Sequence, residues 1–80
     1  MWVVYVLRSK LNGRLYIGYT ASIKERFTAH NNGKVRSTKA YKPYKVAYME
    51  EFSDKTEARK REIFLKTGKG REFLKSIIDK

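Results

Sequence analysis

Apolar and polar residues are distributed so that strands are predicted first along the chain and helices later. Residues 2–7 (Trp-Val-Val-Tyr-Val-Leu) are nearly all apolar and rich in β-branched and aromatic side chains, as in a strand covered on both faces. Asn12-Gly13 is a strong hairpin signal, and residues 15–19 supply the returning strand. The chain is therefore predicted to open with an antiparallel hairpin whose first strand lies in the middle of a sheet.

A two-residue turn at Asn12-Gly13 fixes the register of this hairpin. It predicts four cross-strand pairs: Leu11 with Arg14, Ser9 with Tyr16, Leu7 with Gly18 and Tyr5 with Thr20. Side chains of a strand alternate between its two faces with a period of two residues. Tyr5 and Tyr16 are therefore expected on the same face of the sheet.

The next segment has the signals of a helix. Ser22 followed by Glu25 has the spacing of a capping box, and Asn31-Asn32-Gly33 marks the end of the helix. One stripe of this helix should contain Ile23, Arg26, Phe27 and His30, at positions i, i+3, i+4 and i+7. Arg26 and His30 should consequently flank the buried face of the helix.

Beyond a polar, basic connection that reaches Lys45, the pattern predicts one strand and two more helices. The strand covers residues 46–52, and Asp54 with Glu57 begins a helix that runs to about Lys66. A last amphipathic helix from about Gly70 places four apolar residues on one side, Phe73, Leu74, Ile77 and Ile78. The predicted order is strand, strand, helix, strand, helix, helix, an α+β fold in one domain over residues 1–80.

The charge of the chain narrows the class of partner. It has 19 Lys and Arg against 8 Asp and Glu, a formal net charge of +11, and Glu25 is the only acidic residue before position 41. A run of basic residues crosses the middle of the chain: Lys24, Arg26, Lys34, Arg36, Lys39, Lys42 and Lys45. Such an excess favours a polyanion through release of counterions, and Tyr41 and Tyr44 could stack on bases. Nucleic acid is the predicted partner, and the alternatives are a merely solvated basic surface or an RNA binder of the ribosomal type.

The absence of cysteine limits the chemistry and indicates the compartment. With no cysteine in the sequence, a metal ion would have to be held by oxygen or histidine ligands. Disulfides are excluded too, which favours a reducing, intracellular environment. The longest apolar stretch has about six residues, whereas a membrane span needs about 20. We therefore expect a soluble, cytoplasmic protein without a membrane partner.

The second helix raises the question of a buried carboxylate. Ala58, Glu62 and Leu65 fall on the stripe of this helix that should face the sheet. A buried charge needs a cation, hydrogen bonds or a metal ion. Spacing alone allows ordinary salt bridges from Glu62 to Lys66 or to Arg59, so this pattern leaves both a structural and a metal-binding role open.

Several residues with possible chemistry occur together in a recognisable order. Tyr5 closes a Val-Val-Tyr triplet, Tyr16-Ile17-Gly18 begins eleven residues later, and Arg26 and His30 follow in the next helix, with Glu62 in the one after. This ordered set resembles the GIY-YIG nuclease superfamily, above all its small stand-alone members related to the catalytic N-terminal domain of an excinuclease. The resemblance implies a three-stranded antiparallel sheet flanked by helices. It also implies that Gly18 is the glycine at which substrate or a helix approaches the strand closely.

The resemblance further implies a chemistry and a set of site residues. It assigns catalytic roles to Tyr5, Tyr16, Arg26, His30 and Glu62, with Glu62 as the ligand of one Mg²⁺ or Mn²⁺ ion. The hairpin register and the two helical stripes together predict that these five side chains line one site on a single face of the sheet. The implied activity is hydrolysis of phosphodiester bonds in DNA, including branched or damaged DNA in repair or recombination, with RNA less favoured as a substrate. Some nucleases of the family carry an asparagine beyond the glutamate, and none follows Glu62 here. A nucleic-acid-binding module that keeps the fold without cutting is therefore the alternative.

Overall fold

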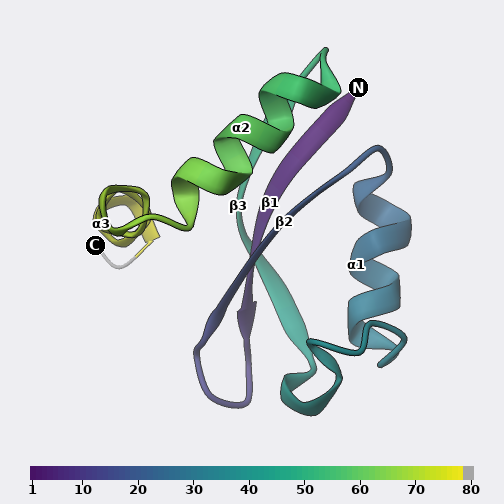
Figure 1. Cartoon of the computed structure of the whole chain (residues 1–80). Coiled ribbons are helices and arrows are strands. Elements are labelled where there is room, and N and C mark those ends of the chain that lie inside the picture. The colour runs from purple at the N-terminus through teal and green to yellow at the C-terminus, as the bar shows by residue number, and fades with distance from the viewer. Residues whose placement is uncertain (79–80) are drawn as a thin grey trace.

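A computed structural model describes residues 1–78 and contains the elements in the predicted order (Figure 1). They are β1 (Trp2–Ser9), β2 (Leu15–Thr20), α1 (Ile23–Asn31), a short 3₁₀ turn (Lys39–Tyr41), β3 (Tyr44–Phe52), α2 (Lys55–Leu65) and α3 (Gly68–Ile78). The strands form one antiparallel sheet in the order β2-β1-β3. The central position of β1 and the α+β fold are thus as predicted.

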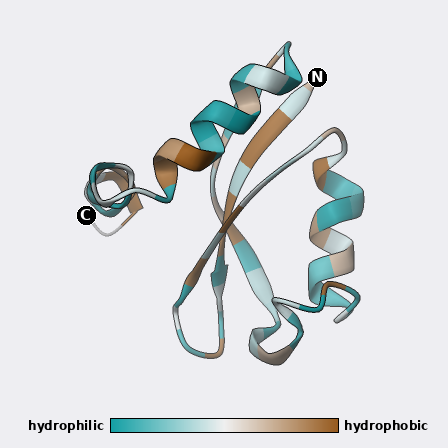
Figure 2. Cartoon of the chain, in the orientation of Figure 1, coloured by the Kyte–Doolittle hydropathy of each residue, from teal (hydrophilic) through white to brown (hydrophobic). Residues whose placement is uncertain are grey.

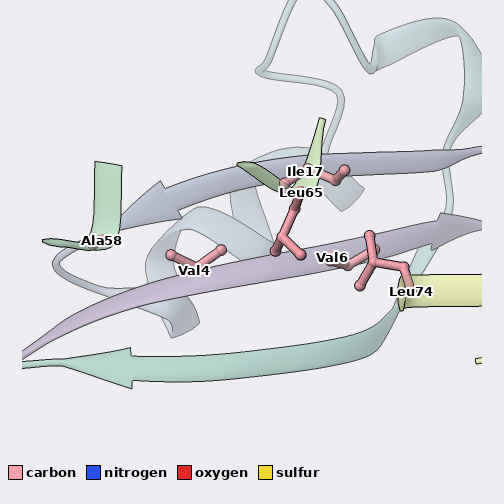
Figure 3. Packing of buried hydrophobic residues seen from close by; sticks show 6 residues of the cluster. All are labelled: Val4, Val6, Ile17, Ala58, Leu65 and Leu74. Carbon is pink, nitrogen blue, oxygen red and sulfur yellow. The ribbon is translucent and has the colours of Figure 1, made fainter. Parts of the chain in front are cut away.

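Helices cover both faces of the sheet. On one face, the side chains of β1 and β2 pack against α2 and α3 in a cluster of Val4, Val6, Ile17, Ala58, Leu65 and Leu74 (Figure 3). On the other face, Val3, Tyr5 and Leu7 pack with Tyr44, and α1 covers them (Figure 1). The hydropathy colouring shows apolar stretches along β1, while the helices mix hydrophilic and hydrophobic segments (Figure 2). This sandwiching explains why residues 2–7 of β1 are apolar.

The hairpin register differs from the prediction by two residues. The structure pairs Tyr5 with Gly18 and Leu7 with Tyr16, where the two-residue turn predicted Thr20 and Gly18 as the respective partners. The loop is longer because the Ser9 N–H donates to the Arg14 carbonyl (2.9 Å), so residues 10–13 all lie in the turn. A shift of two residues leaves every side chain on its predicted face, because the period is also two.

Side-chain hydrogen bonds account for the longer loop. The Ser9 hydroxyl accepts from the backbone N–H groups of Leu11 (3.0 Å) and Asn12 (3.2 Å), and Gly13 adopts a positive φ of 76°. Glycine takes such a conformation without the steric strain that a Cβ brings. Asn12-Gly13 therefore does lie in the turn, but the loop spans residues 10–13 instead of the two predicted residues.

The ends of the other elements lie close to their predicted positions. Asp54 caps α2 by accepting from the Thr56 N–H (3.1 Å), as expected. Ser22 precedes α1 in extended geometry, but its side chain makes no capping hydrogen bond, so the predicted capping box is wrong. Both β3 and α3 begin two residues earlier than predicted. Within residues 1–78, none of the helices has the length and apolar content needed to cross a bilayer.

Candidate active site

Tyr5 lies at the centre of the candidate site, and the register places it beside Gly18. The Tyr5 ring crosses the backbone of β2 so closely that a Cβ on Gly18 would lie 2.5 Å from the Tyr5 hydroxyl oxygen and 2.7 Å from Cζ. Only a residue without a side chain fits there. The close approach that the resemblance implied at Gly18 is therefore made by the tyrosine of the neighbouring strand.

Two side chains of α1 contact the Tyr5 hydroxyl. The Arg26 Nε–H donates to it at 3.4 Å, and Nε2 of His30 lies 3.1 Å from it. Arg26 and His30 are four residues apart and so project from one side of the helix. The Tyr16 ring adjoins both aromatic partners, with its centroid 6.3 Å from that of Tyr5 and 4.9 Å from that of His30. Four of the five predicted site residues thus lie together on one face of the sheet.

His30 is more deeply buried than its predicted place at the flank of the helix, with no exposed surface at all. Both ring nitrogens have hydrogen-bond partners, Tyr5 at Nε2 and the Thr38 hydroxyl at Nδ1, the latter at 2.7 Å. Burial lowers the pKa of His30 to about 4, and the positive charge of Arg26 adds to the effect. His30 is therefore a neutral hydrogen-bonding group at pH 7.

This lowered pKa makes the fold sensitive to acid. The unfolded chain binds a proton at His30 below about pH 6.5, whereas the folded chain does so only near pH 4, so stability should fall as pH drops from 6.5 to 4. The His30 contribution to this loss should approach about 3 kcal/mol. Urea unfolding at several pH values, for the wild type and for His30→Gln, measures it. Carboxylates that titrate in the same range affect both proteins and cancel in the comparison, so parallel pH dependences would contradict the prediction.

Tyr5 and Arg26 are in defined protonation states. Burial raises the pKa of Tyr5, and the hydrogen bond from Arg26 offsets only part of this increase. The same hydrogen bond is the main cause of the raised pKa of Arg26. At neutral pH Tyr5 is therefore a neutral phenol. Its hydroxyl oxygen lies within hydrogen-bonding distance of the neutral imidazole of His30 and the guanidinium cation of Arg26.

Glu62 lies on the predicted stripe of α2 with Ala58 and Leu65, and only 6% of its surface is exposed. Both salt bridges that the spacing allowed are formed, to Arg59 Nη1 at 3.4 Å and to Lys66 Nζ at 3.2 Å. The two cations compensate the buried charge of the carboxylate.

The expectation that all five residues share one sheet face is wrong for Glu62. Its neighbours on α2 pack on the face opposite to Tyr5 and α1. Its negative charge still contributes to the raised pKa of Tyr5, so the two groups are within electrostatic reach. Arg59, which pairs with Glu62, also lies over the ring of Tyr19 in β2, 5.7 Å from its centroid. Glu62 and its partner Arg59 thus lie near the edge of the sheet that β2 forms.

The site offers a divalent cation one carboxylate ligand, that of Glu62, and the other ligands would have to come from water or substrate. Among residues 1–78, no group of three or more His, Cys, Asp or Glu side chains could hold a metal ion. Mg²⁺ commonly binds through one or two carboxylates, several waters and the oxygens of a substrate phosphate. The residues therefore fit a cation that Glu62 and a bound phosphodiester would hold together.

Sequence reasoning missed two features beside the site. Thr38, in the basic connection, is buried and bonded to His30. A cavity of about 160 Å³ adjoins Tyr16, and the Arg14 guanidinium lies over the Tyr41 ring at its wall, 5.6 Å from the ring centroid. Neither feature has a periodic signal, because the residues come from loops and from the end of the hairpin.

The sequence matches known proteins over nearly its whole length. The profile of the GIY-YIG catalytic domain matches residues 1–75. The chain belongs to the GIY-YIG family. Membership in this family makes it a nuclease-type domain, for which nucleic acid is the general class of substrate. The sequence-based identification of the family is confirmed.

Proteins of similar sequence include small ones, some of comparable size. A UPF0213 protein of Staphylococcus haemolyticus is 41% identical over 75 residues, covering 92% of this chain and 90% of the relative. One from Bacillus licheniformis is 44% identical over 63 residues, covering 78% and 64%. The solution NMR structure of a UPF0213 protein from Bacillus halodurans is 31% identical and superposes with a TM-score of 0.58, covering 95% of this chain and 84% of that one. These likenesses support the fold described above.

Proposed function

We propose that this GIY-YIG domain is a DNA endonuclease that hydrolyses phosphodiester bonds with the help of one bound divalent cation. The observation that carries the proposal is the pair of contacts to the Tyr5 hydroxyl, from Arg26 and from His30, beside the Tyr16 ring. Hydrolysis of a phosphodiester needs positive charge around the phosphorus and a group that takes a proton from water. The cluster contains groups suited to both tasks.

Arg26 would bind the scissile phosphate. Its side chain is exposed, its guanidinium is charged, and it contacts Tyr5 through the Nε–H, with a further hydrogen-bonding interaction with Tyr16. The remaining N–H groups form a planar fork that suits the non-bridging oxygens of a phosphate. Arg26 would therefore hold the phosphate next to the Tyr5 hydroxyl and stabilise the charge that develops during attack.

Tyr5 and His30 would handle the proton of the attacking water. As the water oxygen forms a bond to phosphorus, its proton would pass to the Tyr5 oxygen, and the Tyr5 proton would pass to Nε2 of His30. The bond from phosphorus to the leaving oxygen breaks, and that oxygen takes a proton from solvent. A phosphate bound to Arg26 would offset one of the two causes that lower the pKa of His30, making it a better acceptor in the complex. Tyr16, which is less buried than Tyr5, would orient the water.

Glu62 would hold the divalent cation, Mg²⁺ or Mn²⁺, from the opposite side of the β2 edge. When bound, such a cation neutralises charge on the phosphate and on the leaving oxygen. Arg59 and Lys66 pair with the carboxylate in the free protein, and both are long, exposed side chains that can move aside when a cation binds. One carboxylate favours a scheme with one metal ion.

The substrate strand would continue from the scissile phosphate past Tyr16. The cavity there is lined by Arg14, Tyr41, Ser37 and other residues that present a cation, aromatic rings and hydroxyl groups. Stacking on tyrosine and contacts from arginine to phosphate are common ways of holding nucleic acid. The lysines of the connection between α1 and β3 would extend this contact with the DNA backbone.

Cleavage assays test the proposal. Supercoiled, nicked, flapped and branched DNA, and a single-stranded RNA, should be incubated with the protein in Mg²⁺, in Mn²⁺ and in EDTA. We expect cutting of at least one DNA form that requires the metal, with structured DNA preferred, in accord with a role in repair or recombination. If the protein cuts none of these substrates with either metal, the proposed endonuclease activity is wrong.

The second candidate function is nucleic-acid binding without cleavage. It is favoured by the two salt bridges that already occupy Glu62, and by the lack of asparagine beyond this residue. Such a module would bind the same DNA substrates with an affinity that falls steeply as salt rises, and would cut none of them.

A further inference from the structure

We propose that Thr38 is a positioning residue of this site, which fixes the ring nitrogen of His30 that carries the proton and so decides where the Tyr5 proton can go. The inference rests on the proposed function, in which Tyr5 and His30 transfer a proton. Thr38 belongs to the basic connection between α1 and β3, most of which is exposed. Its side chain nevertheless reaches the buried centre of the site.

The contacts of Thr38 form a continuous chain with those of Tyr5. Only 1% of Thr38 is exposed, and its Oγ1 lies 2.7 Å from Nδ1 of His30 and 3.4 Å from the Val35 carbonyl oxygen. The opposite ring nitrogen, Nε2, lies 3.1 Å from the Tyr5 oxygen. Because both ring nitrogens of a neutral histidine are engaged, the hydrogen bond at one nitrogen determines the role of the other.

The Thr38 hydroxyl has a single proton, so there are two possible arrangements. In the first, Thr38 donates to the Val35 carbonyl and accepts from Nδ1–H, which leaves the lone pair of Nε2 to accept the Tyr5 proton. In the second, Thr38 donates to Nδ1, and Nε2–H donates to the Tyr5 oxygen. That oxygen then receives hydrogen bonds from both His30 and Arg26, and its proton cannot move to His30.

The Val35 carbonyl makes the first arrangement available, since it gives the hydroxyl proton an acceptor other than the imidazole. In the first arrangement, every hydrogen-bond donor around Tyr5 also faces an acceptor. Arg26 donates to the Tyr5 oxygen, Tyr5 donates to Nε2, and Nδ1 donates to Thr38. We therefore assign the Nδ1–H tautomer to His30.

The backbone around Thr38 holds this hydroxyl in place. The Thr38 carbonyl accepts from the Tyr44 hydroxyl at 3.1 Å and from the Tyr41 N–H at 3.1 Å, and the Thr38 N–H donates to the Val35 carbonyl at 3.1 Å. Tyr44 is itself part of the core beneath α1. The segment whose lysines would meet DNA is thus fixed to the site at one buried residue.

The test combines NMR of the free protein with kinetics. His30 is the only histidine in the chain, so the ¹⁵N shifts of its ring are assigned without ambiguity and report the tautomer directly. We expect Nδ1–H in the wild type and in Thr38→Ser, which keeps the hydroxyl. Thr38→Val has nearly the same shape without the hydroxyl, and should shift the ring toward Nε2–H, because a buried N–H without an acceptor is costly.

In cleavage assays, Thr38→Val should lower kcat by about 10- to 100-fold with little change in KM, and Thr38→Ser should retain most of the activity. Thr56→Val, at an exposed threonine of α2, is the matched control and should behave like the wild type. An Nε2–H tautomer in the wild type, or full activity in a Thr38→Val protein whose tautomer has shifted, would overturn the inference.

The two readouts separate this inference from the proposed function. The tautomer is measured without substrate, so it tests the hydrogen-bond chain even if the wild type cuts no DNA. In that event the endonuclease proposal fails alone, provided that Nδ1–H is observed and responds to Thr38→Val. If Thr38→Val does not fold, the wild-type tautomer and the activity of Thr38→Ser still decide the matter.

Discussion

Glu62→Gln should lower metal-dependent DNA cleavage by at least about 100-fold while DNA affinity stays equal or rises slightly. The carboxylate is the proposed ligand of the divalent cation, and an amide of the same shape is a much weaker ligand for this hard ion. The substitution also removes a negative charge from a strongly basic protein, so binding of a polyanion should not suffer. Cleavage rates at saturating DNA and binding titrations in EDTA measure the two effects separately.

A matched control lies on the same helix. Glu57 pairs with Lys60 at 3.8 Å, and its side chain is 59% exposed, so Glu57→Gln makes the same chemical change away from the site and should leave cleavage unchanged. Because Glu62 is buried between two cations, its variant also needs a stability measurement before rates are compared. Cleavage by folded Glu62→Gln at the wild-type rate would remove the metal-ligand role, and the observed cutting would then come from another site or from a contaminant.

The sequence was sufficient to predict the element order, because each element has a distinct period. The apolar run in β1 indicated burial on both faces, and the alternation along β2 kept Tyr5 and Tyr16 on one face even though the register was wrong by two residues. The register itself depended on hydrogen bonds that the backbone N–H groups of the loop donate to the Ser9 hydroxyl, and no hydrophobic pattern records these.

The candidate site was predictable where it lies within regular elements. The four-residue spacing of Arg26 and His30 was enough to bring both to Tyr5, and the stripe on α2 was enough to bury Glu62. The pattern did not specify which face of the sheet each helix covers, so the position of Glu62 opposite α1 was missed. Thr38 was missed for another reason, since a buried residue in an irregular segment is determined by tertiary contacts alone. The role of each residue came from the resemblance to the family and not from the pattern.

Gly18→Ala should lower cleavage by about 100-fold and destabilise the fold by about 1–3 kcal/mol, because the added Cβ cannot coexist with Tyr5 in its present position. The methyl group would lie 2.5 Å from the Tyr5 hydroxyl oxygen, and Tyr5 is only 1% exposed, so the ring cannot swing into solvent to make room. Any shift that relieves the contact moves the hydroxyl away from His30 and Arg26.

Gly68→Ala is the matched control, since a Cβ there meets no atom within 4 Å, and it should leave activity and stability nearly unchanged. Urea unfolding, cleavage rates and the ¹⁵N shifts of His30 would be measured on both variants. Wild-type cleavage by Gly18→Ala, with the His30 shifts displaced, would mean that the contact between Tyr5 and His30 has no part in the reaction.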